Sequence, residues 1–91
     1  MNFKELVLEK PESLLVDQSI YDLILYNDEV NTFDWVITSL IDVCQHNDQQ
    51  AEQSALIVHY KGKCTVKSGS LDSLEPRCLA LLDRGLSARI E

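Results

Sequence analysis

The stretch ILYNDEVNTFDWVI, residues 24–37, contains the junction that decides the fold. It begins with the apolar character of a β-strand and ends with the apolar spacing of an amphipathic α-helix. Between these two parts lie Asn27, Asp28 and Glu29, an amide and two carboxylates with no basic residue beside them. Two interpretations remain open at this point: the cluster caps the following helix, or it binds a cation that another molecule supplies.

The second half of this stretch opens a strongly periodic segment. Its apolar residues recur at the spacing of one helix face, at Phe33, Val36, Ile37, Leu40, Ile41 and Cys44. This pattern predicts a helix over residues 33–44 with a wide face turned to the core, capped by Asn31 or Thr32. The sequence HND at 46–48 is expected to end this helix and to cap the next one, with His46 exposed.

Two further helices and three strands follow from the same kind of pattern. Strands are predicted over residues 21–26, 63–69 and, at one edge of the sheet, 86–91. A second helix should run over 48–60 and end near Gly62, a residue suited to a left-handed C-terminal position.

The third helix is predicted from a last apolar stripe, formed by Leu71, Leu74, Cys78, Leu81 and Leu82. Ser70 and Asp72 are its candidate caps, because Asp72 and Glu75 have the spacing of a capping box. Under that interpretation Pro76 falls in the first turn.

The predicted order is therefore β-α-α-β-α-β, in which three strands are too few for a sheet covered on both faces. The economical arrangement is an α+β, two-layer domain, a three-stranded antiparallel sheet packed by three helices. Residues 1–19 are expected to be a flexible N-terminal tail, and residues 20–91 the core domain. The loop after the first strand and the end of the second helix can then meet at one edge of the domain.

The bulk composition limits the classes of partner. With 91 residues and a net charge of −7, the chain lacks the basic surplus needed to bind nucleic acid or an anionic membrane. No apolar run is long enough to span a bilayer and the N-terminus is no secretory signal, so a cytoplasmic location is expected. Three cysteines at wide spacing predict buried, reduced thiols and neither a disulfide framework nor a zinc site. No metal and no cofactor are expected.

Three segments resemble one family. LILYNDEVNTFDWVITSL, AEQSALIVHYKGKC and ALLDRGLSARIE are similar, in order and spacing, to the ClpS-type adaptors of Clp AAA+ proteases. The resemblance extends from Tyr21 to Glu91 and implies the same β-α-α-β-α-β order. It also implies an adaptor and not an enzyme: a monomer that recognises proteins with an N-terminal Leu, Phe, Tyr or Trp. Such adaptors dock on the N-terminal domain of a ClpA- or ClpC-like unfoldase and hand the substrate over, with their own N-terminal tail taking part.

The resemblance assigns the acidic junction to binding of a protein's free N-terminal amine. The matching positions are Asn27, Asp28, Glu29 and His59. At the position of Glu29 many members of the family carry Asp. An ammonium brings one positive charge and three donors, which require several acceptors, at least one of them anionic. The adjoining hydrophobic side-chain pocket is implied at Asn31, Thr32, Phe33, Val36, Leu40, Ala55, Val58 and Leu86. Helix geometry independently places Ala55 and His59 on one face.

Two departures from the family bear on specificity. Ala55 stands where many members have a Met that walls the pocket, which suggests a roomier site that also admits Ile or Val. Phe33 stands where a Met often gates the entrance, and a stiff aromatic ring there can offset the smaller Ala55. Charged contacts to the unfoldase are implied at Asp72 and Arg77.

Other interpretations remain open at this stage. Without the resemblance, residues 27–29 would be a loop and helix-cap cluster and His59 a core histidine. An enzyme could use His59 with Asp28 or Glu29 as an acid–base pair, although no nucleophile, metal or oxyanion site is readable. The main rival is a protein-interaction domain that docks on an AAA+ or ribosomal partner and has no ligand pocket.

Overall fold

The computed structural model describes residues 19–91. Their elements follow in the order β1 (Tyr21–Tyr26), α3 (Phe33–Cys44), α4 (Asp48–Lys61), β2 (Lys63–Gly69), α5 (Leu71–Asp83) and β3 (Ser87–Ile90). The predicted β-α-α-β-α-β order is confirmed. The predicted tail, apart from Ser19, lies outside the described residues.

The sheet is antiparallel, with β1 in the centre of the order β2-β1-β3. At the end of β1, Tyr26 pairs with Lys63, which begins β2, and with Ser87, which begins β3. This register brings the end of α4 and the turn before β3 to the loop that leaves β1. The sheet topology therefore places three distant parts of the chain around one edge of the domain.

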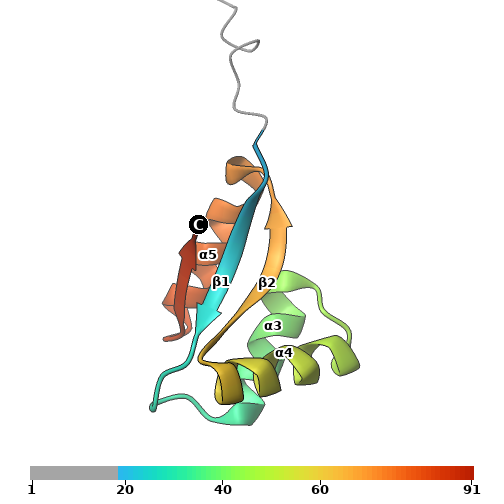
Figure 1. Cartoon of the computed structure of the whole chain (residues 1–91), viewed down its shortest axis with the longest axis vertical. Helices are drawn as coiled ribbons and strands as arrows, with labels where there is room; N and C mark the ends of the chain where they lie inside the picture. Colours follow the sequence, from blue (N-terminus) through green and yellow to red (C-terminus); the bar gives the residue numbers. More distant parts are fainter. Residues whose placement is uncertain (1–18) are drawn as a thin grey trace, which may run out of the picture.

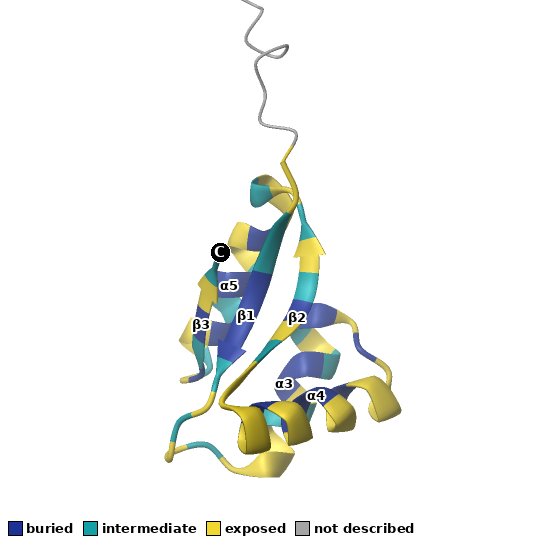
Figure 2. Ribbon diagram, in the orientation of Figure 1, coloured by how far each residue is buried: buried dark blue, intermediate teal, exposed yellow. Residues whose placement is uncertain are grey.

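The helices form the second layer. Figure 1 shows α5 behind β1 and β3, and α3 and α4 beside β2 near the end of β1 where the chain enters the loop. Leucines fill the space between the layers: Leu23, Leu25, Leu40, Leu74 and Leu81 are all fully buried. Figure 2 shows this buried region running along β1 and the facing sides of the helices. Each such side chain contributes roughly 1.5–3 kcal/mol to folding through its removal from water.

Side-chain caps set the helix starts. The Thr32 hydroxyl accepts from the Trp35 amide at 3.1 Å, and the Asn47 side chain accepts from Gln50 at 2.7 Å. Between them Gln45 takes a left-handed conformation with φ of 60°, which ends α3. The predicted break at residues 46–48 is thus confirmed, as is Thr32 as one of the two candidate caps.

The prediction for Pro76 is wrong. Ser70 caps α5 by accepting from the Ser73 amide at 3.2 Å, so the helix begins at Leu71 and Pro76 lies in its second turn. The helix tolerates the ring at the cost of one internal hydrogen bond, since Pro has no amide hydrogen to donate. Asp72 instead occupies the first turn, where the helix dipole favours its carboxylate.

The prediction that His46 is exposed is also wrong, because the residue is only 5% exposed. Its Nε2 lies 2.7 Å from the carbonyl oxygen of Val66 and donates to it. The register between β1 and β2 shifts at this point, since Leu23 pairs with Lys67 and the next residue of β1 pairs with Thr65. Val66 is therefore the extra residue of a β-bulge, and the imidazole satisfies its carbonyl group.

The cysteines are free, as predicted, but only Cys44 and Cys78 are buried, whereas Cys64 is partly exposed on β2. Burial raises the pKa of the Cys44 and Cys78 thiols. Within residues 19–91, no helix has the length and apolar character needed to cross a membrane.

A polar contact fixes the turn between α5 and β3 against α3. The indole nitrogen of Trp35 donates to the carbonyl of Arg84 at 2.9 Å, and the Arg84 guanidinium lies 5.2 Å from the centre of the indole ring. Arg84 also pairs with Asp42 at 3.2 Å. These contacts hold in place the turn that precedes Leu86, a residue that faces the site described next.

Candidate functional site

The loop after β1 is folded around the carboxylate of Asp28. One Asp28 oxygen accepts from the backbone amides of Val30 and Asn31, both at 3.0 Å. The side-chain amide of Asn31 donates to Asp28 at 2.9 Å and to the Gly85 carbonyl at 2.8 Å, which ties the loop to the turn before β3. Ser87 adds a longer contact to Asp28, at 3.5 Å.

These contacts affect the ionisation of Asp28. Partial burial acts to raise the pKa of this carboxyl, but the hydrogen bonds from Asn31, Val30 and Ser87 outweigh burial and hold the pKa below its ordinary value. The ionised carboxylate is thus a structural part of the loop. The sequence had suggested Asp28 as a direct amine-binding group, whereas here its oxygens are already engaged by the domain itself.

The end of α4 reaches the same loop through the sheet. Gly62, with φ of 94°, ends the helix. Its carbonyl oxygen accepts a hydrogen bond from the backbone amide of Asn27 at 2.9 Å. This bond extends the β1–β2 pairing by one step and brings the last turn of α4, with His59, beside the loop. The convergence predicted for these two segments is confirmed.

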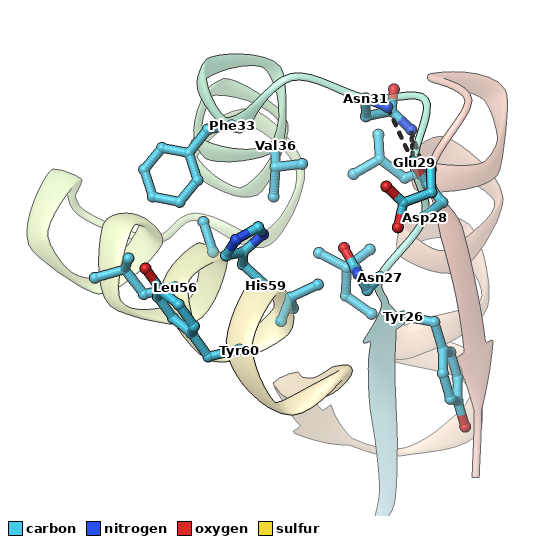
Figure 3. Close-up of a pocket in the computed structure, with 14 residues that line it drawn as sticks. Tyr26, Asn27, Asp28, Glu29, Asn31, Phe33, Val36, Leu56, His59 and Tyr60 are labelled. Carbon is cyan, nitrogen blue, oxygen red and sulfur yellow. Dashed lines mark hydrogen bonds between the residues drawn. The ribbon is translucent and has the colours of Figure 1, made fainter.

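A cavity of about 500 Å³ opens between the loop and α4. Figure 3 shows the His59 ring and the Asn27 side chain on facing sides of the opening, one from α4 and one from the loop. We call Asn27, Glu29 and His59 the polar rim. The apolar floor of the cavity consists of Val36, Ala55, Val58 and Leu86.

The polar rim has side chains with unused hydrogen-bonding capacity. Within residues 19–91 the structure records no hydrogen bond or ion pair for the side chains of Asn27 and Glu29, and His59 makes only an edge-to-face ring contact with Tyr60 at 4.7 Å. The described residues that line the cavity include no lysine or arginine. The opening is therefore an acceptor-rich, negatively charged site beside an apolar surface.

The structure brings together all but two of the residues predicted for the amine site and its pocket. Thr32 does not line the cavity, since its hydroxyl caps α3. Leu40 lies one layer deeper, fully buried in the core. Leu40 has the same helical spacing as residues of α3 that line the cavity. The sequence pattern alone does not show which of these residues lies deeper in the core.

Four lining residues were not predicted: Leu25, Tyr26, Leu56 and Tyr60. Leu56 and Tyr60 each follow a predicted residue and are four apart on α4, so the spacing that joined Ala55 and His59 could have found them. Tyr26 points away from the opening in Figure 3, and its hydroxyl donates to the Glu91 carboxylate. That hydrogen bond raises the pKa of Tyr26.

The residues predicted to contact an unfoldase lie on α5, away from this cavity. Asp72 is exposed in the first turn. Arg77 is half-buried beside a shallow hollow of about 350 Å³ between α3 and α5, and its guanidinium donates to the Val43 carbonyl at 3.0 Å. Arg77 is therefore already engaged in capping the C-terminal end of α3.

Residues 19–91 contain no group of three or more His, Cys, Asp or Glu side chains placed to hold a metal ion. The acidic loop and His59 thus form no such cluster among the described residues. What the arrangement can do chemically is accept hydrogen bonds from a cation while covering an attached apolar group.

Comparison with known proteins places the chain in a family. The family model described as "ATP-dependent Clp protease adaptor protein ClpS" matches residues 17–89. An ATP-dependent Clp protease adapter protein ClpS from Escherichia coli O127:H6 (strain E2348/69 / EPEC) is 35% identical over 63 residues, which cover 69% of this chain and 59% of that relative. The structure of Agrobacterium tumefaciens ClpS2 bound to L-phenylalaninamide matches 82% of this chain and 98% of its own, with a TM-score of 0.78 at 20% identity. The fold is therefore shared with that structure, and the chain belongs to the ClpS family of Clp protease adaptor proteins.

Proposed function

We propose that this protein binds the free N-terminus of substrate proteins whose first residue is bulky and apolar, and delivers them to a Clp AAA+ unfoldase. The observation that carries the proposal is the junction of the polar rim with the apolar floor in one cavity. An N-terminal residue has the matching form, an ammonium attached through a single carbon to an apolar side chain. A ligand with only one of these two parts leaves half of the site unused.

The polar rim would bind the ammonium. Glu29 supplies the negative charge and Asn27 an amide oxygen, because neither is engaged within the described domain. A neutral His59 supplies a ring nitrogen as a further acceptor. Each such charge-assisted bond contributes roughly 1.5–3 kcal/mol, less the cost of desolvation. Asp28 would contribute indirectly, because its carboxylate holds the loop that positions Asn27 and Glu29.

The apolar floor would bind the first side chain. Ala55 and Val58 are 3% and 5% exposed, and Leu86 is 4% exposed, so these walls are fixed by core packing. Burial of a Leu or Phe side chain contributes roughly 1.5–3 kcal/mol. We expect Leu, Phe, Tyr and Trp as first residues, and the small Ala55 extends the range to Ile and Val.

A structural relative supports this assignment. The A. tumefaciens ClpS2 structure contains L-phenylalaninamide. That molecule has a free amine next to a benzyl group and an amide where a chain would continue, so it stands for the first residue of a protein. The shared fold supports a ligand of this kind here. The partner for delivery would be the N-terminal domain of a ClpA- or ClpC-like unfoldase, contacted through α5.

The decisive experiment is a titration of the full chain with a short peptide that begins with Phe and with its N-acetylated twin. Acetylation removes the charge and two donors while leaving the side chain unchanged. We expect it to weaken binding at least about 100-fold, which corresponds to about 2.8 kcal/mol. Equal binding of the two peptides, or no binding of either, would overturn the proposal and favour an interaction domain without a ligand pocket.

A further inference from the structure

The cavity has more room than one side chain needs. Its volume of about 500 Å³ lies within the range of roughly 300–1,000 Å³ typical of sites for drug-sized ligands, which are larger than one residue. Beyond the apolar floor its lining continues through Phe33, Leu56 and Tyr60, which we call the outer shelf. These side chains are 40%, 37% and 76% exposed, so unlike the floor they are open to solvent.

The outer shelf lies on the far side of His59 from the loop acids. Figure 3 shows Phe33, Leu56 and Tyr60 on one side of the imidazole and Asp28 and Glu29 on the other. Leu56 and Tyr60 are four residues apart on α4, so they form one continuous surface. Since the amine and the carbonyl carbon leave the same Cα in different directions, an amine held by the polar rim directs the following chain toward this shelf.

We infer that the outer shelf binds an apolar side chain at the third position of the substrate. The inference rests on the proposed function. Successive side chains of an extended chain point to opposite faces, and each residue advances it by about 3.3 Å. With the first side chain in the floor, the second faces solvent and the third returns to the protein surface about 6.6 Å further on. The adaptor then recognises apolar side chains at the first and third positions of the substrate and not the terminal residue alone.

The test compares three peptides of equal length that begin Phe-Ser-Ser, Phe-Ser-Leu and Phe-Leu-Ser, each titrated by fluorescence polarisation against the full chain. Partial burial of one leucine on an exposed surface should tighten the Phe-Ser-Leu peptide about fivefold over Phe-Ser-Ser. The Phe-Leu-Ser peptide should gain less than about twofold, because its leucine faces solvent.

Variants locate the effect. Leu56→Ala and Tyr60→Ala should each reduce the gain from the third leucine, and Leu56→Ala should leave the Phe-Ser-Ser affinity unchanged. The matched control is Ile57→Ala, since Ile57 is 39% exposed on the same helix but does not line the cavity. Leu56→Ala is the cleaner of the two test variants, because Tyr60 also contacts the His59 ring.

Equal affinity for Phe-Ser-Ser and Phe-Ser-Leu would overturn the inference while leaving the proposed function intact. A larger gain from leucine at the second position than at the third would also overturn it. A gain that Ile57→Ala removes as fully as Leu56→Ala does would place the contact elsewhere and overturn it too. Failure of all three peptides to bind would count against the proposed function itself.

Discussion

The side chains of Asp28 and Asn31 are joined by hydrogen bonds from the Asn31 amide nitrogen to both Asp28 oxygens, at 2.9 and 3.1 Å. The same nitrogen donates to the Gly85 carbonyl at 2.8 Å. The side-chain amide of Asn31 thus connects the acidic loop to the turn before Leu86, a residue that lines the cavity. Asp28 is thus engaged within the domain, whereas Asn27 and Glu29 line the cavity with side chains that make no recorded hydrogen bond within residues 19–91.

The first prediction concerns Asp28→Asn. The new amide group can keep the acceptor role toward the backbone, but its donor nitrogen then faces the donor nitrogen of Asn31. We expect a loss of about 1–2 kcal/mol in the free energy of unfolding at pH 7, measured by urea titration. We also expect weaker binding of a Phe-initiated peptide, since Asn27 and Glu29 lose their fixed position.

The pH dependence of this loss provides its control. The pKa of Asp28 is lower in the folded chain than its ordinary value, so ionised Asp28 favours folding. That contribution is complete above the unfolded pKa of about 3.9, shrinks as the pH falls below it, and is gone below the folded pKa. The stability gap between the wild-type chain and Asp28→Asn should therefore close on acidification. A gap that stays constant down to pH 2.5 would contradict this role of the carboxylate.

The second prediction concerns His59 as an acceptor for the ammonium of a bound peptide. A neutral imidazole can accept a hydrogen bond from an ammonium, and so can the side-chain oxygen of glutamine. His59→Gln should therefore retain most of the affinity for a Phe-initiated peptide, whereas His59→Leu, which has no acceptor, should weaken binding about tenfold. Equal affinities of the two variants would show that His59 is no acceptor.

The helices and strands could be predicted because each repeats a local pattern several times. Residues 33–44 place apolar side chains on one face over three turns, and the predicted range agrees with α3. The strand at residues 63–69 agrees equally with β2. The Pro76 error was local, since the sequence offered two candidate caps two residues apart and Ser70 is the one used. The His46 error arose from a distant contact, because its ring bonds the Val66 carbonyl in the bulge, and no local pattern in the sequence predicts that pairing.

The sequence predicted which residues line the candidate site better than it predicted what each of them does there. The resemblance and the helical spacing gave most of the lining residues, since both depend only on sequence order. They could not distinguish a carboxylate that faces the cavity from one that folds the loop, as Asp28 does. They also missed Leu56 and Tyr60 of the outer shelf. Their four-residue spacing was readable, but the face of α4 that stays exposed depends on how the helix packs against its neighbours.

The third prediction concerns Ala55, which lies 3% exposed in the apolar floor. A small side chain leaves room for a branched Cβ, so Ile- and Leu-initiated peptides should bind within about 100-fold of each other, or about 2.8 kcal/mol. Ala55→Met fills part of this space and should widen the difference about tenfold, mainly by excluding Ile. Parallel titrations of the two peptides against both proteins measure this.

A matched control for Ala55→Met is Ala80→Met, which adds the same side chain at the hollow between α3 and α5. It should leave the Ile-to-Leu ratio unchanged. Wild-type discrimination against Ile of more than about 100-fold would show that Phe33 or another wall already closes the space that Ala55 leaves.

The fourth prediction separates docking from stability on α5. Arg77 and Lys67 donate to the carbonyls of Val43 and Cys44, at 3.0 and 3.2 Å, and so satisfy the C-terminal end of α3. Arg77→Glu removes one of these cations and places a carboxylate beside the negative end of the helix dipole. We expect it to lower the free energy of unfolding by about 1–3 kcal/mol, so a loss of unfoldase binding by this variant would be uninformative.

Asp72→Lys is therefore the variant that tests docking. Asp72 is exposed, and within residues 19–91 its side chain has no recorded hydrogen bond or ion pair. The change loses only the favourable position of a carboxylate at the start of α5, about 1 kcal/mol, so the melting temperature should fall by no more than about 8 °C and the chain should stay folded. We expect it to abolish binding to the N-terminal domain of a ClpA- or ClpC-like unfoldase in a pull-down, while the affinity for a Phe-initiated peptide stays the same. Glu75→Lys makes the same charge change on the same exposed helix and should retain most of the binding. Equal losses in the two variants would mean that the unfoldase senses only the overall charge of α5, and would remove Asp72 as a specific contact.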